Sequence, residues 1–166
     1  MNKRALLPAL LCAFTSSSFA SDWDTRTVTW TEENPLSTLT FMMKGEDIET
    51  IKVVGAEISH SKQGTQRLYL SFIEIANDNS CDPQNTPDNV VVRVNGQPIN
   101  MHQACELADG MALIQTTALS DKGVEFMMNA FSNSPDTVQV EYRSFKADVS
   151  AVGFTKSWNQ SGGDAL

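Results

Sequence analysis

Residues 81–105 read CDPQNTPDNVVVRVNGQPINMHQAC and carry the clearest folding signal in the chain. Two short runs of residues, 90–94 and 97–101, lie on either side of Asn95-Gly96. Asn-Gly is the preferred pair for a two-residue type I′ turn, because both positions take positive φ angles there. The sequence therefore predicts a β-hairpin at residues 90–101, inside a loop that begins and ends with cysteine.

The turn also sets the register of this hairpin. It places Val92 opposite Ile99 and Val90 opposite Met101, so these four apolar side chains share one face, which we expect to be buried. Pro98 falls on the other face, in a pair whose N–H groups point away from the partner strand. That position suits a strand at the edge of a sheet, since proline has no N–H to donate.

Cys81 and Cys105 are the two cysteines that lie outside the first 20 residues. A zinc site needs four ligands, usually in short-spaced pairs, and a redox pair is typically C-x-x-C. We therefore favour a disulfide, which should stabilise the fold by about 3 kcal/mol, with a metal or redox site as the alternative. Extending the hairpin ladder would place residue 86 opposite Cys105, so a bond to Cys81 requires residues 82–88 to fold back.

The N-terminus is typical of a secretory signal peptide. Lys3 and Arg4 precede an apolar run at 5–14, and Ser18-Phe19-Ala20 forms a small-x-small cleavage site. We expect residues 1–20 to be removed and residues 21–166 to form one exported domain, most simply in the periplasm. Cleavage would make the net charge of −8 two units more negative, which disfavours nucleic acid as a partner. No other apolar run approaches the ~20 residues of a transmembrane anchor.

Most of the remaining chain has the patterns of β-strands. Apolar alternation or β-rich runs separated by turn residues occur at 27–31, 36–43, 51–58, 67–75, 111–117 and 138–142. This arrangement predicts a mainly β fold, an antiparallel β-sandwich or a barrel-like domain.

One or two short α-helices are expected in the C-terminal half. After Ser120-Asp121, apolar side chains recur at helical spacing until Pro135 stops the run; they are Val124, Met127, Met128 and Phe131. The methionines are interpreted as core residues and not as cofactor ligands. A second short helix would place Phe154 and Trp158 on one face, before Gly162-Gly163 ends it.

The C-terminal part of the chain resembles a known family. From Cys105 on, the order is a strand, the helical segment SDKGVEFMMNAF, a strand at Val138 and the closing segment KADVSAVGFTKSWN. This resembles the bacterial invasion-associated locus B proteins and their closing S-x-x-GF-x-x-A motif. Ser150, Gly153 and Phe154 match that motif, and Ser157 stands where the usual alanine would be. The resemblance implies a compact β-rich envelope protein and carries over no catalytic residues.

Three groups of residues contain side chains of the types found in catalytic or metal sites. Ser59-His60-Ser61-Lys62 contains an S-x-x-K pattern but lacks its companion motifs, and a hairpin loop is the better interpretation. Asp78, Asp82 and Asp88 do not have the spacing of an EF-hand, so no metal is expected. Glu74 and Glu141 are interpreted as outward-facing strand residues and not as a glycosidase pair. No cofactor is predicted.

Two surfaces are candidates for binding a partner. One is the acidic loop with Asp82 and Asp88, held in place by the disulfide. The other is an aromatic patch at Phe154 and Trp158, although Trp158 could instead close one end of the core. We therefore expect a non-catalytic envelope or periplasmic protein that binds a protein partner. The alternative is an inhibitor or immunity protein that blocks a periplasmic hydrolase, and a small hydrolase is the third hypothesis.

Overall fold

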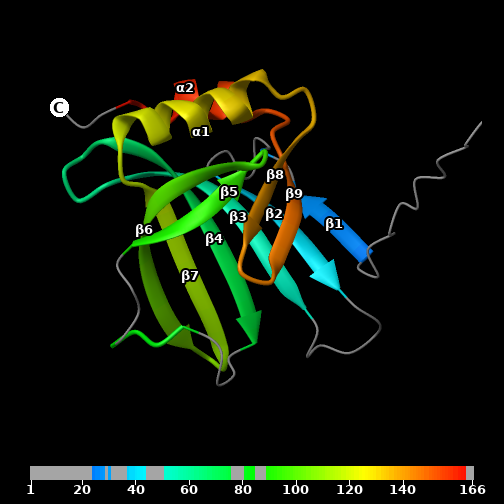
Figure 1. The fold of residues 1–166 in the computed structure, drawn as a ribbon. Helices are drawn as coiled ribbons and strands as arrows, with labels where there is room; N and C mark the ends of the chain where they lie inside the picture. The colour runs from blue at the N-terminus through cyan, green and yellow to red at the C-terminus, as the bar shows by residue number, and fades with distance from the viewer. Residues whose placement is uncertain are drawn as a thin grey trace, which may run out of the picture.

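A computed structural model describes residues 24–28, 30, 37–43, 51–75, 81–84 and 89–163. The expected signal peptide, residues 1–20, lies outside these ranges. The described chain forms nine antiparallel strands and two short helices (Figure 1). They are β1 (Asp24–Val28), β2 (Ser37–Met43), β3 (Lys52–His60), β4 (Gln66–Ile75), β5 (Asn89–Val94), β6 (Gln97–Ala108), β7 (Met111–Ala118), α1 (Asp121–Asn133), β8 (Thr137–Tyr142), β9 (Phe145–Ser150) and α2 (Phe154–Gln160).

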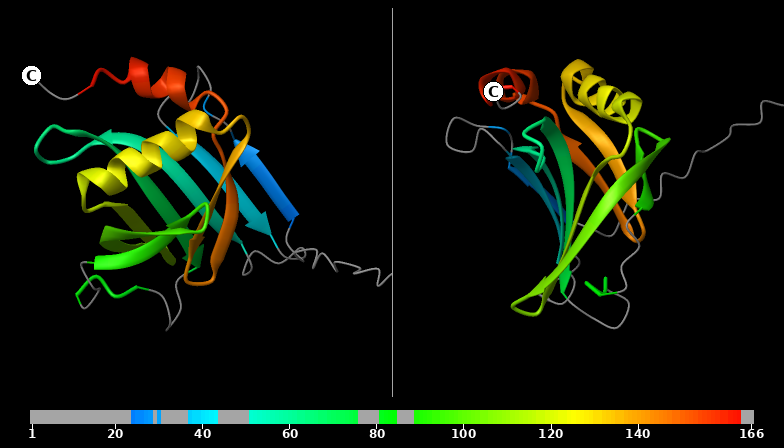
Figure 2. Two further views of the ribbon diagram at one scale, coloured as in Figure 1. Left: turned by 45° about the horizontal axis from the view of Figure 1, so that its top comes forward. Right: turned by 90° about the vertical axis from the view of Figure 1, so that its left-hand side faces the viewer.

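The strands form one sheet that curls back on itself. Their order is β1-β2-β3-β4-β7-β6-β5-β8-β9, and β9 packs against β2 and β3 at the other end of this order. Two side-chain hydrogen bonds cross the junction. Thr40 Oγ1 donates to the Asp148 carbonyl oxygen at 3.2 Å, and Trp30 Nε1 donates to the Ser150 carbonyl oxygen at 2.9 Å. The result is a nearly closed barrel with both helices across one end (Figure 2), which confirms the predicted barrel-like β fold.

The central hairpin has the predicted turn and register. Asn95 and Gly96 have φ angles of 48° and 79°, as a type I′ turn requires. Val92 pairs with Ile99, and Val90 with Met101. The expectation of an edge position is wrong for the strands as a whole, because β5 and β6 both lie inside the strand order.

Pro98 nevertheless occupies a local edge. β6 pairs with β7 only from Met101 to Ala108, and the Asn100 carbonyl oxygen accepts a hydrogen bond from Leu119 N at 3.1 Å. Pro98 has only β5 as its ladder partner. Proline is tolerated there because no neighbouring strand needs its N–H.

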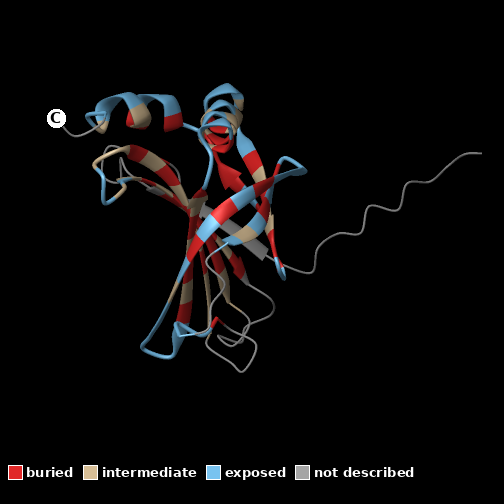
Figure 3. Ribbon diagram, turned by 60° about the vertical axis from the view of Figure 1, so that its left-hand side comes forward, coloured by how far each residue is buried: buried red, intermediate tan, exposed pale blue. Residues whose placement is uncertain are grey.

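The inside of the barrel is filled by apolar side chains from alternate positions of the strands (Figure 3). The largest fully buried side chains are aromatic: Phe72, Phe131, Phe145 and Phe154. Helix α1 covers the upper end in the view of Figure 1. Ser120 caps it, its Oγ accepting a hydrogen bond from Gly123 N at 3.1 Å, and Met127 and Phe131 point into the core. Burial of each large side chain contributes about 1.5–3 kcal/mol.

Three element boundaries differ from the sequence-based expectation. Strand β9 was not expected, β6 continues to Ala108 instead of ending near Met101, and β1 begins at Asp24 instead of residue 27. The turn before β9 explains the first difference, since Arg143 adopts φ 51° without the glycine that usually marks such a turn.

Candidate partner-binding site

The predicted disulfide between Cys81 and Cys105 is confirmed, with a Cα–Cα distance of 6.0 Å. Cys105 lies on the same side of β6 as the buried Met101, so the bond is on the inner side at the lower end of the barrel. Asp82 is exposed, and its Oδ1 accepts a hydrogen bond from Gln84 N at 2.8 Å. Asp88 lies outside the described residues. The disulfide therefore fixes Asp82 beside the barrel end, and residues 85–88 of the expected fold-back lie outside the described residues.

Polar side chains gather inside the barrel near this disulfide. Tyr142 donates a hydrogen bond to Gln103 Oε1, and burial raises the pKa of Tyr142 above its usual value of 10.0. Lys52 Nζ lies 2.6 Å from Ser144 Oγ, to which it donates, and 3.9 Å from Glu74 Oε2. These contacts satisfy polar groups at the mouth of an apolar core, which is a structural role.

The two carboxylates considered as a glycosidase pair lie on opposite sides of the sheet. Glu74 shares the inner side of β4 with Phe72, which corrects the expectation that it faces outward. Glu141 does face outward, and its Oε1 lies 2.8 Å from Nζ of Lys146 on the neighbouring strand. The pair therefore does not face a common substrate position.

The Ser59-His60-Ser61-Lys62 segment forms the end of the β3–β4 hairpin, as predicted. Ser61 Oγ accepts hydrogen bonds from Gln63 N at 3.3 Å and from Thr65 N at 3.2 Å, which shapes the turn. His60 Nε2 lies 2.7 Å from the Gly163 carbonyl oxygen and so contacts the C-terminal segment. These residues hold the chain together at the upper end of the barrel.

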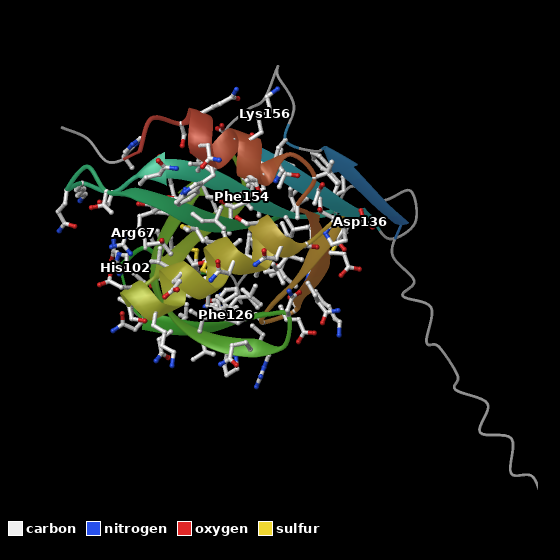
Figure 4. The ribbon with its side chains drawn as sticks, turned by 90° about the horizontal axis from the view of Figure 1, so that it is seen from above. Arg67, His102, Phe126, Asp136, Phe154 and Lys156 are labelled. Carbon is white, nitrogen blue, oxygen red and sulfur yellow. A yellow bond between two sulfur atoms is a disulfide. The ribbon has the colours of Figure 1, made fainter. Side chains whose placement is uncertain are left out.

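The aromatic residues of α2 form part of the core. Phe154 is fully buried, and its ring centroid lies 5.4 Å from that of Trp30, 5.3 Å from that of Phe131 and 5.7 Å from that of Trp158. Figure 4 shows Phe154 between the two helices, over the end of the barrel. Trp158 is half-buried, and its carbonyl oxygen accepts a hydrogen bond from Gln66 Nε2 at 2.9 Å. Phe154 therefore does not reach the surface, and Trp158 closes the end of the core.

The outer side of the wall formed by β2, β3, β4 and β7 carries a continuous row of apolar side chains. Cross-strand pairing aligns a row of apolar side chains there, with Phe41 beside Val53, Val53 beside Ile73, and Ile73 beside Leu113. The next row, toward the helices, contains Leu39, Gly55, Ser71 and Gln115. The Leu39 side chain covers Gly55, since a Cβ added there would lie 2.9 Å from Leu39 Cδ2, and the short side chain of Ser71 keeps this row lower than the row of Ile73. A shallow hollow of about 220 Å³ results, which we call the outer hollow.

A polar row borders the outer hollow on the side nearer the helices. Glu57 pairs with Tyr69, Tyr69 with Thr117, and Thr117 with His102. Burial raises the pKa of Tyr69; the neighbouring Arg67 lowers it and Glu57 raises it. On the opposite side, Glu106 lies next to Leu113 at the end of the apolar row. The outer hollow is thus an apolar recess with an acid at two of its corners.

A second hollow, of about 360 Å³, lies between the first residues of β6 and the beginning of α1. Ile99 and Phe126 supply its apolar part, and Asn100, Ser120 and Lys122 supply polar groups. It is a gap between two elements, whereas the outer hollow is continuous with an apolar sheet face. We therefore place the candidate site at the outer hollow.

The chain was compared with protein-family models, curated proteins and solved structures. No significant match was found. The resemblance to invasion-associated locus B proteins therefore stays a prediction. Within the described ranges, no three His, Cys, Asp or Glu side chains are close enough to hold a metal ion. No helix in the same ranges is long and apolar enough to cross a membrane.

The sequence-based search for a site did not find the outer hollow. Its lining residues come from four strands, and each looks like an ordinary strand residue in the linear sequence. Only the registers β2–β3, β3–β4 and β4–β7 bring them together. The one local signal was Gly55 within a strand pattern, which often marks a close approach or a recess.

Proposed function

We propose that this protein is an exported, non-catalytic protein of the cell envelope that binds a protein partner through the outer side of the β2–β3–β4–β7 wall. The observation that carries this proposal is the apolar outer hollow described above. An apolar recess with a polar border is the usual anatomy of a protein-binding surface. The signal-like N-terminus and the Cys81–Cys105 disulfide support export to an oxidising compartment.

The roles of the other candidate residues also support binding over catalysis. Ser61 shapes a turn, His60 contacts the C-terminal segment, and Glu74 contacts Lys52 at the mouth of the core. Each of these three side chains has a structural partner, which supports a structural role for it over a catalytic one.

An inhibitor or immunity protein of a periplasmic hydrolase is the alternative. The observation that favours it is the exposed Asp82, which the disulfide holds beside the lower end of the barrel. Such an acidic point is suited to a basic or substrate-lined cleft. This function would use Asp82 and not the outer hollow, so the two proposals can be separated by mutation.

The test is affinity capture from an envelope extract of the producing cells, with four immobilised proteins: the native chain, Ile73→Asp, Val91→Asp and Asp82→Lys. Val91 is a matched control because it is an exposed apolar strand residue on the outer side of β5, away from the outer hollow. We expect the native chain, Val91→Asp and Asp82→Lys to retain the same partner and Ile73→Asp to lose it. Loss with Asp82→Lys alone would favour the inhibitor, and a native chain that retains nothing would contradict both proposals.

A further inference from the structure

The size of the apolar wall around the outer hollow limits what can cover it. Four strands at about 4.8 Å spacing give a width of roughly 19 Å, and residues 69–75 of β4 give a length of roughly 20 Å. The flat extent is therefore about 400 Å². A standard protein–protein interface buries about 800 Å² on each partner. A second copy of this chain, packed sheet against sheet, would therefore extend beyond the apolar rows and bury polar surface as well.

A single α-helix fits this surface better. A helix with its side chains is about 10 Å wide, and about 14 residues of it span roughly 21 Å. Its large apolar side chains can enter the outer hollow between the row of Val53 and Ile73 and the row of Glu57 and Tyr69. Binding of an amphipathic helix in an apolar groove is a common mode of recognition. The buried interface area is small, and a few side chains of the helix enter the groove.

The charge around the outer hollow indicates the sign of the partner. Glu57 lines the recess and Glu106 lies at the far end of the apolar row, and neither forms an ion pair with another described residue. The whole chain carries a formal charge of −8, so its field also attracts cations. Two arginines belong to the surrounding strands. Arg67 of β4 donates from Nη1 to the Ala118 carbonyl oxygen at 3.5 Å, and Arg26 of β1 pairs with Phe41 at the end of the apolar row opposite Glu106.

We propose that the outer hollow binds one basic amphipathic helix of a partner protein, with the apolar side of the helix over Leu39 and Ser71 and its basic side chains near Glu57 and Glu106. This inference rests on the proposed function and specifies the partner that the site accepts. The recess supplies affinity through apolar burial, and the two acids supply orientation and a faster association rate.

The test uses synthetic 14-residue peptides and fluorescence anisotropy. The first peptide is a helix of Leu and Lys with Leu at i, i+3, i+4 and i+7; the second has the same composition in scrambled order; the third replaces Lys with Glu. The native protein should bind the first peptide at least tenfold more tightly than either control. Equal binding of the scrambled peptide would reduce the interaction to net charge and overturn the inference, as would equal binding of the acidic helix.

Three variants locate the binding. Ser71→Phe fills the recess on the exposed side without entering the core and should weaken binding of the basic helix at least tenfold. The pair Glu57→Lys and Glu106→Lys should weaken it by a similar factor and reduce its dependence on salt. Glu125→Lys is the matched control, since Glu125 is exposed on α1 and is not among the residues that line the outer hollow, and it should leave the affinity unchanged within twofold.

Two further results would overturn the inference. One is unchanged helix binding by Ser71→Phe, with circular dichroism showing that the variant is folded. The other is a native dimer in sedimentation velocity that Ser71→Phe converts to monomer, because the face would then be covered by a second copy. Either result leaves the capture experiment with Ile73→Asp as an independent test of the proposed function.

Discussion

Replacement of Gly153 by alanine tests how α2 is attached to the barrel. Gly153 precedes α2 with φ +92°, a conformation that costs an alanine about 1–2 kcal/mol. An added Cβ would also lie 2.7 Å from the Trp30 carbonyl oxygen and 3.2 Å from Trp30 Cβ. Because the first contact is with backbone, Trp30 has to move.

Movement of Trp30 weakens two further interactions. Its Nε1 hydrogen bond to the Ser150 carbonyl oxygen contributes about 1 kcal/mol, and its edge contact with Phe154 contributes about 0.5–1.5 kcal/mol. We therefore expect Gly153→Ala to lower the free energy of unfolding by about 3–4 kcal/mol. The matched control is Gly96→Ala, which has φ +79° but nothing within 4 Å of an added Cβ, and which should cost about 1–2 kcal/mol.

Urea denaturation followed by tryptophan fluorescence measures this difference. With a slope of about 2 kcal/mol per M, the midpoint of Gly153→Ala should lie about 1 M below that of Gly96→Ala. Equal midpoints for the two variants would refute the contact between Gly153 and Trp30 and, with it, the packing of α2 described here.

Three other predictions follow from the fold. Removal of the disulfide in a Cys81→Ser, Cys105→Ser variant should lower the free energy of unfolding by about 3 kcal/mol in urea denaturation. The native protein, purified without reductant, should be two hydrogens lighter than its reduced form by mass spectrometry, and two free thiols would contradict this. Phe131→Ala should lower the free energy of unfolding by about 3–5 kcal/mol in the same assay, because the ring is fully buried and packs against Phe154 of α2. A loss below 1 kcal/mol would show that α1 does not pack on the core. Both tyrosines, Tyr69 and Tyr142, have pKa values raised by burial, so the midpoint of tyrosinate absorbance in the folded protein should lie above pH 10. Their contribution to stability is present below the unfolded pKa and is lost as pH rises through the folded pKa values, and a midpoint at pH 10 or lower would contradict the burial.

The parts of the fold that were predicted correctly have strong local signals. Asn95-Gly96 sets both the turn and the register of its hairpin, so the pairing of Val92 with Ile99 followed from the sequence. Likewise, Ser120 and Pro135 mark the two ends of α1 by capping and by loss of an N–H. In each case a few neighbouring residues determine the structure.

Of the parts that were missed, β9 depends on contacts between distant residues, whereas the longer β6 has a local signal in the sequence. Strand β9 follows a turn at Arg143 and Ser144 that lacks an Asn-Gly or Asp-Gly signal, and its packing against β2 stabilises it. The β6–β7 turn does contain Asp109-Gly110, with φ angles of 52° and 76°, a signal that favours the longer β6 found in the structure.

The candidate site could not be predicted for a similar reason. Ile73 and Leu113 are 40 positions apart in the sequence and become neighbours only through the β4–β7 register. The sequence-based candidates had local signals instead. The structure places Phe154 in the core and Asp82 next to the disulfide at the lower end of the barrel.

The central claim is that the outer hollow is the partner-binding surface, and chemical-shift mapping tests it most directly. The ¹⁵N-labelled protein would be titrated with the partner recovered from the envelope extract, and amide shifts followed along each strand. We predict the largest changes at Gly55, Ser71 and Leu113, with little change at Asp82 or along α2. Changes confined to residues 81–84, or to the surface of α1 and α2, would contradict the claim.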